Sequence, residues 1–161
     1  DERLIPSFYY DEVFGTVLNR FIVQAVCNHP LTVYGTGTQI RGYLNLKDTM
    51  QCIDLSAANP ADKGELRVFN QLTETFSVNE LAEKVEGAGN RRGHKVKVEK
   101  IENPRVEKEE HYYNPKYTGL VELGLSPHFL TGDVLDGIFE TVERHKDRIE
   151  RDAIFRGVSW K

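Results

Sequence analysis

Glycines close together in residues 87–93 are the first feature of this sequence whose spacing could serve chemistry. Gly87, Gly89 and Gly93 stand roughly as in a loop that cradles the pyrophosphate of a dinucleotide. In such a loop the glycines follow a strand and open a helix, whose N-terminus faces the phosphates. Here they follow a helical pattern, so we interpret them as a helix C-cap and turn.

Other residue types used in catalysis or metal binding show no productive spacing. The five histidines are His29, His94, His111, His128 and His145. None stands at ligand spacing from another, which predicts no metal site. Cys27 and Cys52 lie in apolar helical patterns, so we expect buried free thiols, as in a reducing compartment. There is also no serine elbow and no Cys–His arrangement, so these residues alone predict only an α/β domain that binds an anion.

Charge and hydrophobicity limit the classes of partner that this protein is expected to bind. The chain has 161 residues, with 21 basic against 25 acidic side chains and a net charge of -4. Binding to nucleic acid through a broad positively charged surface is therefore not expected. Because no apolar run could span a bilayer and no signal peptide opens the sequence, we expect a soluble protein that is neither membrane-bound nor secreted.

Apolar periodicity predicts about five helices and three or four short strands, a mixed α/β fold. Helices are expected over residues 11–28, over residues 48–58 with Asp48 as N-cap, from the capping box of Ser77 and Glu80 to residues 87–89, over residues 114–124, and from Thr131 onward. Strands are expected at residues 31–34, 39–46, 66–70 and 95–101. These are too few strands for a complete doubly wound sheet.

Several segments taken together are more specific than any single motif. They are residues 11–16, 18–21, 31–35, 39–44, 47–48, 67–71, 76–81, 103–107, 110–114 and 158–161. In this combination the chain resembles the UDP-sulfoquinovose synthase family, within the extended short-chain dehydrogenases/reductases that act on nucleotide sugars. Gly42 stands where most members of that superfamily have aspartate, and the match covers nearly the whole chain.

The resemblance implies that residues 1–161 are the C-terminal, UDP-sugar-binding portion of a Rossmann-type enzyme. The N-terminal half of such an enzyme binds NAD and supplies the catalytic Thr, Tyr and Lys, and no residues here match it. Family members oxidise the glucose C4 hydroxyl of UDP-glucose with NAD+, remove water across C5 and C6, add sulfite at C6 and reduce the ketone again. Alone, the segment is expected to be inactive.

The resemblance also implies contacts for the UDP-sugar. The strand of Thr32, Val33 and Tyr34 would offer main-chain groups to uracil. Arg41 and Arg105 would clamp the pyrophosphate, because guanidinium groups match phosphate oxygens. Further contacts would be Glu107 to a ribose hydroxyl, Asn19 and Arg20 from the exposed side of the first helix to the diphosphate or sugar, and Gln39 nearby.

Other interpretations stay open at this point. Arg20, Arg41 and Arg105 could be surface charges, and Tyr34 and Tyr43 could be core or wall residues. The chain could also come from another NAD-dependent UDP-sugar epimerase or dehydratase, or be a non-catalytic binding or assembly module. The resemblance further implies the N-terminal half as a partner, a homodimer when complete, and a location in the bacterial cytoplasm or the plastid stroma.

Overall fold

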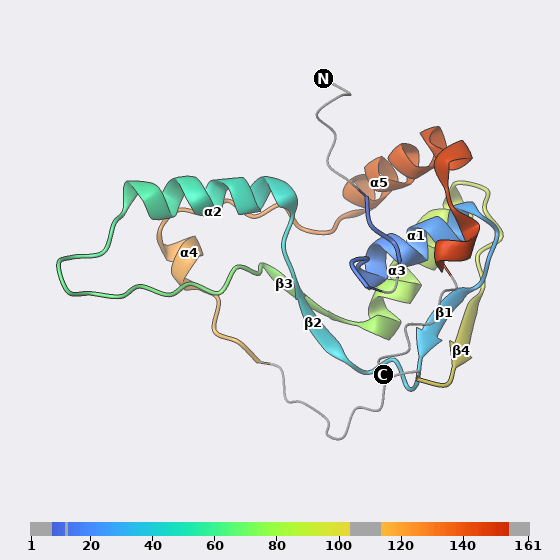
Figure 1. Cartoon of the computed structure of the whole chain (residues 1–161), viewed down its shortest axis with the longest axis horizontal. Coiled ribbons are helices and arrows are strands. Elements are labelled where there is room, and N and C mark those ends of the chain that lie inside the picture. The colour runs from blue at the N-terminus through green and yellow to red at the C-terminus, as the bar shows by residue number, and fades with distance from the viewer. Residues whose placement is uncertain (1–7, 12, 104–113, 155–161) are drawn as a thin grey trace.

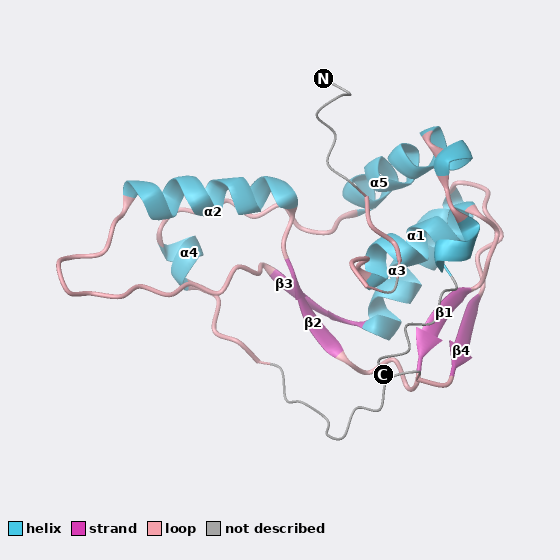
Figure 2. Ribbon diagram, in the orientation of Figure 1, coloured by secondary structure: helices cyan, strands magenta, loops and turns pink. Residues whose placement is uncertain are grey.

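The computed structural model describes residues 8–11, 13–103 and 114–154. Across these ranges, five α-helices and four short strands form the mixed α/β fold that the sequence predicts (Figures 1 and 2). The elements are α1 (Val17–Val26), β1 (Leu31–Tyr34), β2 (Ile40–Tyr43), α2 (Leu46–Ala58), β3 (Glu74–Ser77), α3 (Val78–Arg91), β4 (Val98–Ile101), α4 (Gly119–Glu122), α5 (Gly132–Arg144) and the 3-10 helices η2 (Lys146–Arg148) and η3 (Arg151–Ile154).

The main core lies between α1, α3, α5 and β1. Phe21 and Val26 of α1, Leu81 of α3 and Phe139 of α5 are fully buried there. Gly89 allows close packing at this point, since a Cβ on it would lie 2.5 Å from Val96 and 3.3 Å from the Phe139 ring. The glycine therefore serves packing between α3 and its neighbours, not a turn.

Two pairs of strands lie beside this core. Parallel strands β1 and β4 pair with Leu31 opposite Val98, and antiparallel strands β2 and β3 pair with Ile40 opposite Ser77. Strand β3 runs directly into α3. The predicted capping box at this junction is confirmed, because Ser77 and Glu80 each accept a hydrogen bond from the other's backbone N–H.

Two predicted helix starts are wrong. The first helix begins at Val17 with Thr16 as N-cap, because the Asp11 carboxylate accepts the N–H groups of Val13 and Phe14 in a preceding turn. Helix α2 is capped by the Asn45 side chain, which accepts the Lys47 N–H. Asp48 lies inside α2 instead.

Three further predictions need correction. Helix α3 continues through the glycine pair to Arg91, and the chain turns at Gly93, whose φ is +88°. The helix expected over residues 114–124 is reduced to the single turn of α4. Residues 66–70 form no strand, because no neighbouring described strand is in place to pair with them.

A smaller hydrophobic cluster joins α2 and α4 at the other end of the molecule (Figure 1). Its buried members are Cys52, Leu120 and Leu125, flanked by Leu44, Leu55 and Phe69. Both cysteines are free, as predicted, although Cys27 is only partly buried. None of the described helices is long and apolar enough to cross a membrane.

Candidate functional site

The edge of β1 that faces away from β4 is held by two polar side chains of α1. Leu31 and Gly35 donate to carbonyls of the β4 segment, so the main-chain groups of Thr32, between them, point the other way. The Thr32 N–H donates to Gln24 Oε1 at 3.1 Å, and its C=O accepts from Arg20 Nη2 at 3.1 Å. Gln24 Nε2 also donates to Thr32 Oγ1 at 2.8 Å. These groups of Thr32 therefore support the strand.

Arg20 lies inside the protein, which corrects its expected place on the exposed side of the first helix. Only 8% of Arg20 is exposed. Its guanidinium lies 4.3 Å from the centroid of the Tyr34 ring, at cation–π distance. Asn19 is partly buried and donates to the Tyr9 carbonyl at 2.9 Å. Arg20 thus fixes both the strand and the aromatic ring at its end.

Gln39 lies under the turn that follows β1. Its Nε2 donates to the Tyr34 carbonyl at 3.4 Å, and a Cβ on Gly35 would lie 3.8 Å from the same nitrogen. Gln39 Oε1 is buried and accepts no hydrogen bond from the described residues. A buried acceptor without a donor costs about 1–3 kcal/mol, so this oxygen is a candidate for meeting a ligand's N–H or O–H.

The turn itself depends on glycine. Gly37 has a φ of +73°, and a Cβ at this position would overlap the side chains of Asn79 and Val33. Asn79, in the first turn of α3, donates its N–H to the Gly37 carbonyl and its side-chain amide to the Thr36 carbonyl. The turn is therefore clamped between the end of β1 and the start of α3.

Arg41 extends the site along β2. It is exposed on the strand, and its Nη1 donates to the Ile40 carbonyl at 2.8 Å. Burial raises the pKa of Tyr43 to about 12, an effect that the positive charge of Arg41 partly opposes. The Tyr43 ring packs at 5.7 Å from the ring of Phe76, so Tyr43 is a wall residue next to an exposed guanidinium.

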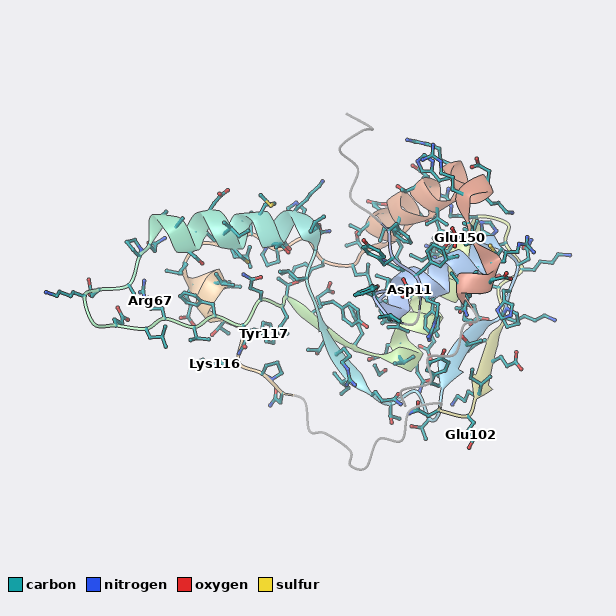
Figure 3. All side chains as sticks on the ribbon, in the orientation of Figure 1. Asp11, Arg67, Glu102, Lys116, Tyr117 and Glu150 are labelled. Atoms are coloured by element: carbon teal, nitrogen blue, oxygen red, sulfur yellow. The ribbon has the colours of Figure 1, made fainter. Side chains whose placement is uncertain are left out.

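Arg105 and Glu107, the other two predicted contacts, lie outside the described residues. The chain that leads to them leaves β4 at the carboxyl end of the parallel pair, which Glu102 marks in Figure 3. Asn103 passes close to the turn after β1, since a Cβ on Gly35 would lie 3.5 Å from the Asn103 Cβ. Ligands of α/β proteins commonly bind outside the carboxyl ends of parallel strands.

The glycines of residues 87–93 do not form a dinucleotide-binding loop. Gly87 and Gly89 lie inside α3 and are not at the start of a helix that follows a strand. The position of Gly89 against Val96 and Phe139 leaves no cradle for a pyrophosphate. No group of three or more His, Cys, Asp or Glu side chains in the described ranges is placed to hold a metal ion.

Several polar contacts were not visible in the sequence. Gln24 stands in an apolar helical stripe, where nothing in the pattern signals its role. Fully buried Asp48 accepts from the His128 N–H at 2.8 Å and lies 2.6 Å from His128 Nδ1, across 80 positions of the chain. Arg92 and His94 both bind Glu143. Only the fold brings such pairs together.

Two tyrosine–lysine pairs stand four residues apart in the sequence: Tyr43 with Lys47, and Tyr112 with Lys116. Tyr43 ends β2 and Lys47 lies in α2, so the first pair does not share a helix. On a helix the spacing would place the ammonium beside the phenol and lower its pKa. Lys116 lies in an irregular segment before α4, where its carbonyl accepts from Asn70, and Tyr112 is outside the described residues. The helical geometry that the pair would need is not present at Lys116.

Comparisons with known proteins place this site in context. No family model matches the chain. It is 54% identical over 160 residues to chloroplastic UDP-sulfoquinovose synthase of Spinacia oleracea, covering 99% of this chain and 33% of that protein. It is 44% identical over 163 residues to UDP-sulfoquinovose synthase of Sulfolobus acidocaldarius, covering 100% of this chain and 42% of that protein. The chain thus spans well under half the length of these relatives.

The fold also matches part of an enzyme whose structure has been solved. The structure of UDP-glucuronic acid 4-epimerase from Bacillus cereus, in complex with UDP-glucuronic acid and NAD, matches with a TM-score of 0.64 and 19% identity, covering 86% of this chain and 43% of that one. This likeness shows a shared Rossmann-type fold. Sequence and fold together identify the chain as a C-terminal portion of an extended short-chain dehydrogenase/reductase, similar over its whole length to UDP-sulfoquinovose synthase.

Proposed function

We propose that this chain is the UDP-sugar-binding portion of an enzyme that makes UDP-sulfoquinovose from UDP-glucose and sulfite with NAD+. The observation that carries the proposal is the identity of 54% to the spinach synthase over 99% of the chain. Function belongs to the site and not to the fold, so sequence identity of this size supports the proposal more strongly than a shared fold does.

The base of the nucleotide would sit at the end of β1. Here the Tyr34 carbonyl accepts from Gln39 Nε2, and Gln39 Oε1 is buried. Val33, which pairs with Lys100 of β4, would act by holding the strand in place. The uracil ring has an N–H that can donate to such an oxygen. Thr32 and Arg20 would act indirectly, because their hydrogen bonds hold the strand and the Tyr34 ring in place.

The diphosphate would lie beside β2, where Arg41 is exposed and its guanidinium would form charge-assisted hydrogen bonds to phosphate. Arg105 would complete the clamp, Glu107 would accept from a ribose hydroxyl, and Asn19 would approach the sugar side. These assignments follow from the resemblance and from the position of β4, which ends at Ile101, four residues before Arg105.

The remaining parts of the reaction would belong to the N-terminal half of the longer enzyme. That half would bind NAD and carry the catalytic Thr, Tyr and Lys, and the complete protein would form a homodimer. This chain, residues 1–161, would contribute no catalytic residue and be inactive alone. The spinach relative is chloroplastic, which supports the plastid stroma as the compartment in a plant, with the cytoplasm as the bacterial equivalent.

Calorimetric titration of the longer enzyme with UDP tests the site. Arg41→Ala should weaken UDP binding about 10- to 100-fold, as expected for a lost hydrogen bond to a charged group. Arg148→Ala, an exposed arginine on η2, is the matched control and should leave the affinity unchanged. Equal affinities for the two variants would show that the diphosphate does not lie at Arg41.

The reaction is tested with UDP-glucose and sulfite supplied to the longer enzyme. Formation of UDP-sulfoquinovose supports the proposal. If the only product is a C4 epimer, the enzyme is an epimerase of the same superfamily. If UDP-glucose does not bind at all, the chain is an assembly module, and the proposal is wrong.

A further inference from the structure

Asn79, in the first turn of α3, makes three contacts with the turn between β1 and β2. Its main-chain N–H donates to the Gly37 carbonyl at 3.0 Å, and its Nδ2 donates to the Thr36 carbonyl at 3.0 Å. Its side chain also covers the Cα of Gly37, because a Cβ at that position would overlap the Asn79 amide. One residue of α3 therefore fixes two successive carbonyls of the turn and packs on the glycine itself.

Gln39 is the residue that this turn carries into the candidate site. Its main-chain carbonyl accepts from the Val78 N–H at 3.2 Å, where the pairing of β2 with β3 runs into α3. Its side-chain contact is weaker, because the 3.4 Å between Gln39 Nε2 and the Tyr34 carbonyl is longer than most N–H···O hydrogen bonds. The position of the Gln39 amide therefore depends on the turn that Asn79 holds.

The contact with Tyr34 also orients the Gln39 amide. The Tyr34 carbonyl can only accept, so the NH2 of the amide faces Tyr34 and Oε1 faces the other way. Oε1 is buried and accepts from none of the described residues. An amide held in this orientation can accept an N–H of a ligand, but it offers no donor to a second acceptor. Uracil has a ring N–H, whereas cytosine has an unprotonated ring nitrogen at the same position.

We propose that Asn79 is a positioning residue for the nucleotide base. By holding the turn, Asn79 places Gln39 Oε1 where it accepts the ring N–H of uracil, and the enzyme thereby favours UDP over CDP. The inference rests on the proposed UDP-sugar site. Asn79 itself would not contact the ligand, because its amide is bound to Thr36 and packed on Gly37. A loosened turn would cost UDP this hydrogen bond, whereas CDP does not form it and would lose nothing.

Calorimetric titration of the longer enzyme with UDP and with CDP tests the role of Asn79. The parent should bind UDP at least about 10-fold more tightly than CDP, as expected for one hydrogen bond to a buried acceptor. Asn79→Ala should reduce this preference to less than about 3-fold by weakening UDP binding alone. Asn79→Asp should do the same, because an ionised carboxylate has no N–H for the Thr36 carbonyl. Unchanged CDP affinity in both variants would show that the site is still folded.

Asn59→Ala is the matched control. The Asn59 side chain also donates to a main-chain carbonyl, that of Leu55 at 2.8 Å, but at the end of α2, so both affinities should stay unchanged. Substitutions of Asn79 that weaken UDP and CDP binding equally would show a structural role only and overturn the inference. A parent that binds UDP and CDP equally well would overturn it too, while leaving the proposed function in place. A parent that does not bind UDP would instead refute the proposed function, and this inference with it.

Discussion

Glu143 of α5 binds two residues at the end of α3 and just beyond it. Its carboxylate accepts from Arg92 Nε at 3.2 Å and Nη2 at 2.7 Å, and it lies 2.8 Å from His94 Nε2. The hydrogen bonds from Arg92, followed by that from His94, hold the pKa of Glu143 at about 2, well below its ordinary value of 4.5. The end of α3 is thereby tied to the last turns of α5.

This depressed pKa makes a prediction about acid stability. A carboxyl group whose pKa is lower when folded contributes stability above its unfolded pKa, and loses it as the pH falls toward the folded value. Glu143→Gln should therefore lower the free energy of unfolding at pH 7 by about 1–3 kcal/mol, and the difference from the parent should shrink between pH 4.5 and about 2. Urea unfolding at a series of pH values measures both effects.

Glu140 provides the matched control. Glu140 belongs to α5, as Glu143 does, and its Oε1 lies 3.8 Å from Arg92 Nη1. Its side chain, however, is 61% exposed. Glu140→Gln should cost less than about 1 kcal/mol, since solvent screens an exposed ion pair. Equal losses for the two variants, or a loss for Glu143→Gln that does not depend on pH, would contradict this account of Glu143.

At the scale of elements, the turn between β1 and β2 governs the candidate site. It connects the end of the parallel pair to the strand that carries Arg41, and it packs on the first turn of α3 through Asn79. Both the left-handed backbone of Gly37 and the lack of space around its Cα require glycine. The position of Gln39 under Tyr34 depends on this turn.

Gly37→Ala should accordingly lower the free energy of unfolding by more than backbone strain alone would. The positive φ costs about 1–2 kcal/mol for alanine, and the overlap with Asn79 and Val33 adds to it. Gly64→Ala is the matched control, because Gly64 has a φ of +86° and a Cβ at that position would meet no described atom within 4 Å. Chemical unfolding compares the two variants, and equal losses would show that the turn can shift to make room.

At the scale of the whole molecule, the two hydrophobic clusters differ in size. The larger one joins three helices and β1, whereas the smaller one has three buried members and lies at the opposite end (Figure 1). Local stability in proteins follows the number of buried apolar contacts. The part of the molecule around the smaller cluster should therefore unfold locally while the main core stays folded.

Leucine truncations in the two clusters test this division in the chain alone. Leu81→Ala should lower global stability by about 2–5 kcal/mol, because Leu81 is fully buried in the main core. Leu120→Ala should instead speed exchange of the amides of α2 and α4, with little change in α1 and α3. Exchange that rises uniformly in both variants would show a single cooperative unit.

The features that the sequence predicted correctly depend on residues close together in the chain. The capping box at Ser77 was predicted correctly, because the atoms involved stand three residues apart. The start of the last helix at Thr131 was also predicted, and Thr131 is its N-cap. The strand at Leu31–Tyr34 was also found from its own residues. Residues 66–70 have equally strong strand character, yet a strand needs a neighbour, and no local pattern reports whether one is present.

The sequence alone determined the α/β class, most element types and the resemblance to an extended short-chain dehydrogenase/reductase, since these depend on periodicity, caps and residue identity. Only the tertiary structure decided which polar groups are inside. It buried Arg20 against Tyr34, placed Gln24 on Thr32 and joined Asp48 to His128. The physical reason is that a buried polar side chain must find hydrogen-bond partners, and its partners come from elements distant in the chain.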